Sequence, residues 1–243
     1  MSINNFLWNL SPDYFKYQNL KTNQVMDFEI KIKKPELLLS YLPNDIVFSP
    51  IQLSGKYNSD WNTLNASLKA NFIELYRYRI NSLNLSLDKP LNQPLFLKLS
   101  SLANSYDSIA LGDKLAIEAN LLDNLMKFRL KATSEELKFN SSINGNLSFA
   151  KDTLTLNFLS SGFNTHGRNW VINENGTIKY HTKFLDLTNL VIENATQRLT
   201  FNGRVSKNIQ DKMNIAFNNF EPGKLLYDLN ILTNDTLSGI ANG

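Results

Sequence analysis

Residues 170–239 read WVINENGTIKYHTKFLDLTNLVIENATQRLTFNGRVSKNIQDKMNIAFNNFEPGKLLYDLNILTNDTLSG, and this stretch decides the fold. Apolar and polar residues alternate through it, which is the period of a β-strand with one buried face. Trp170 and Ile172 precede an Asn175-Gly176 pair, and Ile178 continues the alternation after it. An Asn-Gly pair between alternating runs predicts a β-hairpin with its turn at that pair.

The same alternation extends over most of the chain. Residues 25–32 form a predicted strand, and Pro35 begins a short helical turn after it. Turns or loops are expected at 88–94, 111–113 and 160–167, where Gly, Pro and small polar residues gather. The pattern as a whole predicts about fifteen strands in a long, curled antiparallel sheet, a mainly β fold with one or two short helices.

Composition and charge exclude several classes of protein. Hydrophobic residues make up 42% of the 243, as is typical of a folded chain. The net charge is +3 and the lysines are scattered, so no nucleic acid partner is expected. The chain has no cysteine, which excludes disulfides, thiolate metal sites and a cysteine nucleophile. No stretch approaches the ~20 apolar residues of a membrane-spanning helix.

The sequence contains no recognisable catalytic motif: nucleophile elbow, phosphate-binding loop and dinucleotide fingerprint are all missing. The two histidines, His166 and His181, have no helix-spaced partner and no acidic cluster nearby, which favours a surface role. Lys31, Lys33 and Lys34 fit the solvated face of a strand. We therefore expect a protein that is not an enzyme, with no catalytic residues, no cofactor and no metal.

A five-residue unit, apolar–Ser/Asn–Gly–x–apolar, occurs four times, and each glycine shares the parity of its apolar neighbours. A glycine on the buried face of a strand permits close backbone approach or a sharp coil of the sheet. We therefore expect the four glycines to set the curvature of the sheet. They are Gly55, Gly145, Gly203 and Gly239.

A longer repeat relates residues 26–55 to residues 213–239. Both read as a strand, a proline-started helical turn, a loop and a glycine-bearing strand. The repeat predicts that residues 1–243 form a single elongated fragment of a larger protein, with a module join near 213–239.

A sheet of this length needs something to cover its apolar face. A second sheet would give a β-sandwich, and with it a structural or adhesive module of a cell-surface protein with recognition loops such as 160–168. Alternatively, a sheet curled into an open groove binds lipid chains, at about 0.8 kcal/mol per buried methylene. The residues expected to line such a groove alternate along the predicted strands. They are Leu83, Leu85, Leu87, Leu97, Leu99, Leu115, Ile117, Leu154, Leu156, Phe158, Ile178, Tyr180, Leu199, Phe201, Ile215 and Phe217.

The series W-x-I, N-G-x-I, L-x-L-T-N-L-x-I-x-N, Q-x-L-x-F-x-G-x-V-S, I-x-F-x-N-F and L-S-G-x-x-N-G runs from residue 170 to residue 243. It resembles the TamB-type translocation and assembly module proteins, which belong to the AsmA-like, bridge-like lipid transfer superfamily, and most of all their Bacteroidetes-like branch. Residues 12–87 resemble the same family.

The resemblance implies an apolar β-groove (a β-taco) that carries phospholipid acyl chains or assists outer-membrane protein assembly. It also implies a periplasmic location, with the full-length protein anchored in the inner membrane. An Omp85-type outer-membrane assembly protein is the implied partner, contacted through parts outside this internal fragment.

Overall fold

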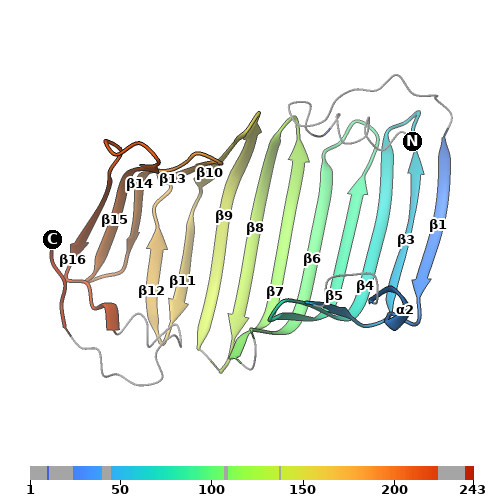
Figure 1. Ribbon diagram of the computed structural model, residues 1–243, viewed down its shortest axis with the longest axis horizontal. Helices are drawn as coiled ribbons and strands as arrows, with labels where there is room; N and C mark the ends of the chain where they lie inside the picture. The colour runs from blue at the N-terminus through green and yellow to red at the C-terminus, as the bar shows by residue number, and fades with distance from the viewer. Residues whose placement is uncertain (1–9, 11–23, 40–44, 107–108, 137, 224–238) are drawn as a thin grey trace. The chain divides into compact units, whose positions relative to one another are not determined.

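The computed structural model describes residues 10, 24–39, 45–106, 109–136, 138–223 and 239–243. Its strands confirm the predicted mainly β fold, because sixteen of them form one antiparallel sheet (Figure 1). Their bounds are β1 (Val25–Ile32), β2 (Ile46–Phe48), β3 (Ile51–Asn58), β4 (Thr63–Leu75), β5 (Tyr78–Lys89), β6 (Leu95–Tyr106), β7 (Ile109–Leu122), β8 (Leu125–Ser134), β9 (Phe139–Ala150), β10 (Thr153–Phe158), β11 (Ser161–Thr165), β12 (Arg168–Ile172), β13 (Thr177–His181), β14 (Phe184–Glu193), β15 (Arg198–Ser206) and β16 (Met213–Asn218). Along its main path the order is β1-β3-β4-β5-β6-β7-β8-β9-β10-β13-β14-β12-β11, with β15 between β14 and β16 and with β2 on β4.

The chain divides into two compact units, which we call unit 1 (residues 1–132) and unit 2 (residues 133–243). The helical turn predicted after Pro35 is α2 (Glu36–Leu39). The predicted module join near 213–239 falls mostly on residues 224–238, outside the described residues, and stays a prediction. In the described ranges no helix has the length and apolar character needed to cross a bilayer.

Short polar turns connect the long strands of unit 1. After β3, the Asn58 side-chain oxygen accepts hydrogen bonds from the backbone N–H groups of Asp60 (3.0 Å) and Trp61 (3.1 Å). This is the local side-chain capping that places Asn in turns. Between β5 and β6 the backbone N–H of Gln93 donates to the carbonyl of Pro90 (3.2 Å), which confirms the turn predicted at 88–94.

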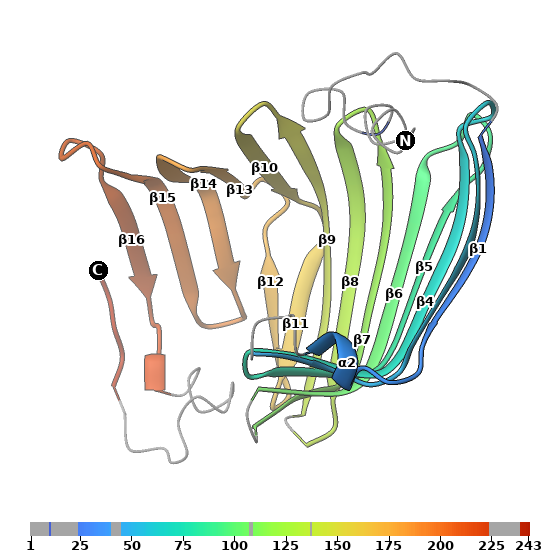
Figure 2. The same ribbon diagram turned by 45° about the vertical axis from the view of Figure 1, so that its right-hand side comes forward.

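Three shifts of register interrupt the strands of unit 1. The register of β5 against β6 shifts between Arg79 and Asn81 and again between Asn81 and Asn84, and that of β6 against β7 shifts between Asn104 and Ser105. Ser82 and Ala103 have φ values of +49° and +51°, a left-handed conformation that marks irregular backbone for residues other than glycine. Beyond these bulges the tip of the β4–β5 hairpin turns away from the direction of the main strands, and β2 pairs with this tip (Figure 2).

In unit 2 two pairs of short strands continue one another in line. β10 pairs with the second half of β9 and β11 with the first half, while β13 and β12 share β14 in the same way. The hairpin predicted at Asn175-Gly176 is therefore wrong, because β12 and β13 run in the same direction along β14. The cause lies at Asn173, whose side chain donates to the carbonyl of Asn189 and accepts from the N–H of Val191, both at 2.8 Å. These bonds fix residues 173–176 as a break in a strand that continues.

Two other predicted turns are also wrong. Residues 160–167 contain β11, which pairs with both β9 and β12, so only His166-Gly167 forms the turn. Residues 111–113 lie inside β7, where Gly112 pairs with Asn104 next to a bulge. Small residues suggested loops in both places. A strand that pairs on both sides is stabilised by backbone hydrogen bonds to its two neighbours, so it tolerates small side chains. The recognition loop expected at 160–168 is consequently part of the sheet.

The core of unit 2 consists of two clusters that share Ile192 and Phe201. Trp170 is 2% exposed and stacks on Phe163 with ring centroids 6.0 Å apart. Aromatic stacking of this kind adds to the free energy of burial. The buried members of the first cluster are Phe158, Ile172 and Leu190, and those of the second are Trp170, Leu199 and Phe220.

Candidate functional site

Strand register brings the apolar residues of unit 1 into rows that cross neighbouring strands. From β1 through β3, β4, β5 and β6 to β7, each residue of a row stands directly opposite the next. One row is Ile30, Leu53, Leu68, Leu85, Leu99 and Ile117. The adjacent row is Phe28, Gly55, Ala66, Leu87, Leu97 and Ala119. We call these two rows the apolar face of unit 1.

The opposite face of the same strands is polar, because successive side chains of a strand point to opposite sides. Ser54 and Ser67 stand opposite one another there, with their hydroxyl oxygens 3.1 Å apart. The complete row between the two apolar rows is Glu29, Ser54, Ser67, Ser86, Lys98 and Glu118. The sheet of unit 1 therefore separates its apolar and polar side chains over six strands.

The apolar face of unit 1 is only partly covered. Leu85, Leu99 and Ile117 are half-buried, and Ile30 at the sheet edge is 50% exposed. The described strands all belong to one sheet, so they do not form the two-sheet sandwich considered as the alternative. Central residues of a packed sandwich are shielded from both sides, whereas these residues have a sheet on one side only.

One corner of this region is covered by Leu10. Its side chain is 2% exposed and packs with Leu95, Leu87 and Leu121, and its carbonyl accepts a hydrogen bond from the N–H of Asn124 (3.1 Å). The N-terminal part of the chain thus reaches the end of the apolar rows at this residue.

Lys89 stands opposite Leu64 in line with the apolar residues of β5. It is 6% exposed, and this burial lowers the pKa of its ammonium group. A lysine at such a position places its aliphatic stem against apolar neighbours.

The groove-lining residues predicted in unit 2 also come together in cross-strand pairs. Phe158 and Leu199 are buried, whereas Tyr180 and Ile215 are 52% and 46% exposed. Several of these residues pack inside the two clusters of unit 2, so this part of the predicted set is more closely packed than the apolar face of unit 1. The pairs are Leu154 with Tyr180, Leu156 with Ile178, Leu199 with Phe217 and Phe201 with Ile215.

The four predicted glycines occupy different environments. Gly55 lies opposite Phe28, and a Cβ atom added to it would stand 2.7 Å from the ring of Phe28, so the glycine makes room for that ring. Gly145 pairs with Phe158 across β9 and β10. Gly203 has φ +124° and adjoins the bulge of β14 against β15, and Gly239 has φ +146° outside the strands. Their effect on curvature stays a prediction.

Charged side chains of unit 2 form a structural array on the polar side of the sheet. Arg204 donates two hydrogen bonds to one carboxylate oxygen of Asp186, at 2.7 and 3.0 Å, and its guanidinium lies 4.5 Å from the ring centre of Phe184. The hydrogen bond from Arg204 lowers the pKa of Asp186. These contacts connect β14 to β15, and we interpret them as structural.

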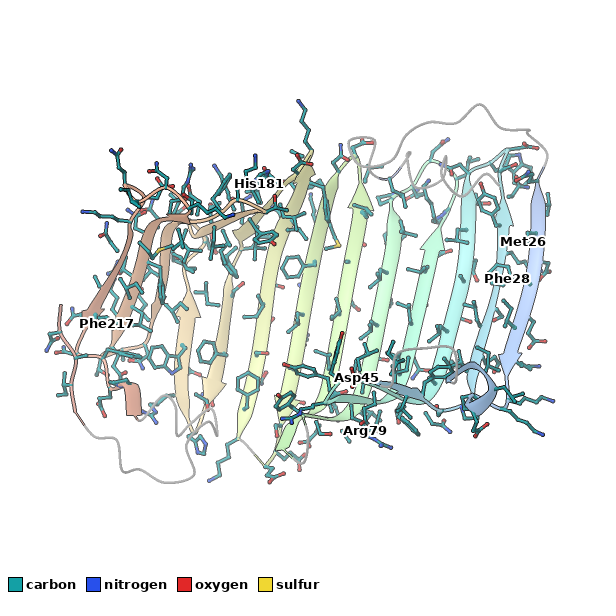
Figure 3. All side chains as sticks on the ribbon, viewed as in Figure 1. Met26, Phe28, Asp45, Arg79, His181 and Phe217 are labelled. Carbon is teal, nitrogen blue, oxygen red and sulfur yellow. The ribbon has the colours of Figure 1, made fainter. Side chains whose placement is uncertain are left out.

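The two histidines lie at or next to turns of unit 2. His181 accepts a hydrogen bond at Nδ1 from the N–H of Lys183 (3.1 Å) and stacks on Phe184 with ring centroids 5.2 Å apart (Figure 3). His166 lies in the β11–β12 turn. Within the described part of the chain no three His, Asp or Glu side chains are grouped to hold a metal ion.

Sequence reasoning missed the asparagines that bond the backbone at strand breaks. Besides Asn173, Asn144 donates from its side chain to the carbonyl of Ser160 (2.6 Å), and Ser161 Oγ donates to the carbonyl of Asn144 (2.9 Å). The available signal was an Asn inside an alternating run, where it is a poor strand former.

Comparison with known protein families, with curated proteins and with solved structures finds no match to this chain. Its distinguishing feature is a sheet with apolar rows on one face, polar rows on the other and no second sheet among the described strands. The apolar face of unit 1 is therefore the candidate functional site.

Proposed function

We propose that this chain is a non-enzymatic segment of a TamB-like protein and that the apolar face of unit 1 carries phospholipid acyl chains. The observation that carries the proposal is the row from Ile30 to Ile117, in which six strands present half-buried or exposed apolar side chains in register. An acyl chain needs apolar area and no specific polar contact, which is what such a row supplies.

The dimensions of the row suit an acyl chain. Six strands about 4.8 Å apart span about 24 Å from first to last. The hydrocarbon core of a bilayer is about 30 Å thick, so the chains of one leaflet span about 15 Å. Each methylene moved from water to the face contributes about 0.8 kcal/mol, so even partial contact along the row supports binding.

The cellular setting follows from the family resemblance. In this proposal the segment lies in the periplasm, the full-length protein is anchored in the inner membrane, and an Omp85-type outer-membrane protein contacts other parts of it. Assistance to outer-membrane protein assembly belongs to the same proposal.

The proposal is tested by extracting lipid from the purified protein and identifying it by mass spectrometry. Leu85→Asp places a charge on the apolar face, whereas Ser86→Asp places the same charge one residue away on the polar face. We expect phospholipid with the unaltered chain and with Ser86→Asp, and its loss with Leu85→Asp, because an acyl chain does not pack against a carboxylate. Protein that is consistently free of lipid, or equal lipid in both variants, contradicts the proposal.

A further inference from the structure

Unit 1 contains a second apolar site, a cavity of about 550 Å³ at the turned-over tip of the β4–β5 hairpin. Leu75, Tyr78 and Ile80 come from the tip, and Leu115 and Ala132 come from β7 and β8. Its volume falls within the range of about 300–1,000 Å³ of small-molecule sites, which are mainly apolar with a few polar groups. No residue of the two apolar rows lines this cavity, although its wall residue Leu115 lies on the same face of β7 as Ile117. Binding in the cavity is therefore tested by variants that leave the rows unchanged.

Among the described residues, the charged side chains that line the cavity are both cations, Arg79 and Lys114. Arg79 is held in place: its Nε donates to Asn81 Oδ1 (3.0 Å), it pairs with Glu74 at 3.4 Å, and its guanidinium lies 4.1 Å from the ring centre of Phe72 (Figure 3). Lys114 is exposed and has no ion-pair partner in the described part of the chain. Among the described residues, Lys114 therefore brings an unpaired positive charge to the apolar walls of the cavity.

The rim of the cavity exposes large apolar side chains. Tyr76 is 73% exposed, Tyr78 is 54% exposed and Leu75 is 42% exposed. Neighbouring exposed groups of this size mark binding sites more often than ordinary surface.

We propose that this cavity binds a single-chain anionic amphiphile, with its hydrocarbon tail against Leu115 and Ala132 and its anionic head group at Lys114. The tail is placed by the apolar walls. The head group is placed by Lys114, the lining cation without an ion-pair partner among the described residues. The same face of the cavity repels a cationic head group and offers a neutral one no charge-assisted hydrogen bond.

The test compares oleate with oleyl alcohol, which have chains of the same length and differ in charge, by isothermal titration of the whole chain. We expect saturable binding with oleate the tighter ligand. Lys114→Met keeps the aliphatic stem and removes the charge, so it is expected to weaken oleate about tenfold and to leave oleyl alcohol unchanged. Lys98→Met, an exposed lysine on the neighbouring strand β6, is the matched control and is expected to change neither.

Two further variants locate the bound chain. Ala132→Phe fills the cavity and is expected to abolish binding of both ligands, whereas Leu85→Asp, on the apolar face, is expected to leave oleate binding intact. Circular dichroism and thermal unfolding verify that each variant is folded, and Lys114→Met carries the test if Ala132→Phe does not fold.

The inference is overturned by three results: no saturable oleate binding, equal effects of Lys114→Met and Lys98→Met, or binding lost in Leu85→Asp and kept in Ala132→Phe. The last result places oleate on the apolar face of unit 1. It would support the proposed acyl-chain function and contradict the proposal that the cavity binds an amphiphile. Conversely, if oleate binds through Lys114 but the purified protein contains no phospholipid, the cavity proposal is supported and the acyl-chain proposal is contradicted.

Discussion

Asparagine side chains replace backbone hydrogen bonds at the strand breaks of unit 2. Asn173 serves both the N–H of Val191 and the carbonyl of Asn189, and Asn202 accepts from the N–H of Asn189 (3.3 Å). Asn189 itself has φ +49°, a conformation that Asn tolerates better than most residues. The amide therefore supplies both the donor and the acceptor that a break in the ladder leaves without strand partners.

Asn173→Ala is expected to lower the free energy of unfolding by about 1–3 kcal/mol, because it leaves a backbone N–H and a carbonyl without their partners. Asn173→Asp keeps the acceptor for Val191 and loses the donor to Asn189, so its loss should be smaller. Asn214→Ala, at an exposed position of β16, is the control and should stay within about 0.5 kcal/mol of the unaltered chain. Urea unfolding measures all three, and equal losses for Asn173→Ala and Asn214→Ala contradict the role of the amide.

The ion pair of Asp186 and Arg204 gives unit 2 a defined pH dependence. The hydrogen bond from Arg204 lowers the pKa of Asp186 in the folded state, while its pKa in the unfolded chain is about 3.9. The folded state thus binds its proton less readily, so the stabilisation is complete above the unfolded pKa and is lost as the pH falls through the folded pKa. The side chain of Arg204 is 45% exposed, so solvent screening keeps the effect small.

Asp186→Asn is expected to cost about 0.2–1 kcal/mol at pH 7, and the difference from the unaltered chain should shrink as the pH falls below about 4. Urea unfolding at a series of pH values between 7 and 3 measures it. If the difference in free energy of unfolding between Asp186→Asn and the unaltered chain grows as the pH falls, the ion pair does not have the stabilising role described here.

The long hairpins of unit 1 change direction at bulges in β5 and β6. Ala103 adopts φ +51° inside β6, where the backbone carbonyl of Ala103 accepts a hydrogen bond from the side chain of Asn81. A left-handed conformation costs an L-residue with a Cβ about 1–2 kcal/mol, which the bulge imposes to turn the hairpin tip. That tip forms one wall of the cavity proposed to bind an amphiphile.

Glycine substitutions should have opposite consequences inside and outside this bulge. Ala103→Gly removes the left-handed strain and is expected to leave the free energy of unfolding unchanged or to raise it by up to about 1 kcal/mol. Ala116→Gly, in a regular part of β7, has no strain to relieve and is expected to lose about 0.5–1 kcal/mol. Thermal unfolding of both variants distinguishes them, and a larger loss for Ala103→Gly argues against strain at the bulge.

The two units bury their apolar residues in different ways. In unit 1 the row that contains Leu85 has no second sheet over it among the described strands, and Leu85 is half-buried, whereas in unit 2 Leu199 is 7% exposed inside the second core cluster. A substitution of one apolar side chain by a carboxylate should therefore have unequal costs in the two units, because the cost of a charge depends on how completely water is excluded.

Leu199→Asp is expected to destabilise unit 2 by about 3–5 kcal/mol, the range seen when a buried charge has no partner, because Leu199 is 7% exposed. Leu85→Asp is expected to cost unit 1 at least about 2 kcal/mol less, since the new carboxylate keeps access to water. In a background that carries Trp8→Phe and Trp61→Phe, fluorescence of Trp170, which lies in the second cluster, reports the unfolding of unit 2, and circular dichroism reports the whole chain. Equal losses for the two variants would indicate that the apolar face of unit 1 is as closed as the clusters of unit 2.

The sequence by itself determined the fold class and the two faces of the strands. Alternation at positions such as Leu83, Leu85 and Leu87 fixes which side chains share a face, because the period of a strand is two and no distant contact changes it. The mainly β fold, the single antiparallel sheet and the short helix after Pro35 were predictable for this reason.

Only the tertiary structure decided which strands pair and where they break. Asn175-Gly176 has the local chemistry of a hairpin turn, yet β12 and β13 continue along β14, because Asn173 finds its partners at Asn189 and Val191 on that strand. Residues 161–165 and 111–113 likewise form strand because neighbours on both sides supply backbone hydrogen bonds. These partners lie on other strands, and the local propensity of a segment contains no information about them.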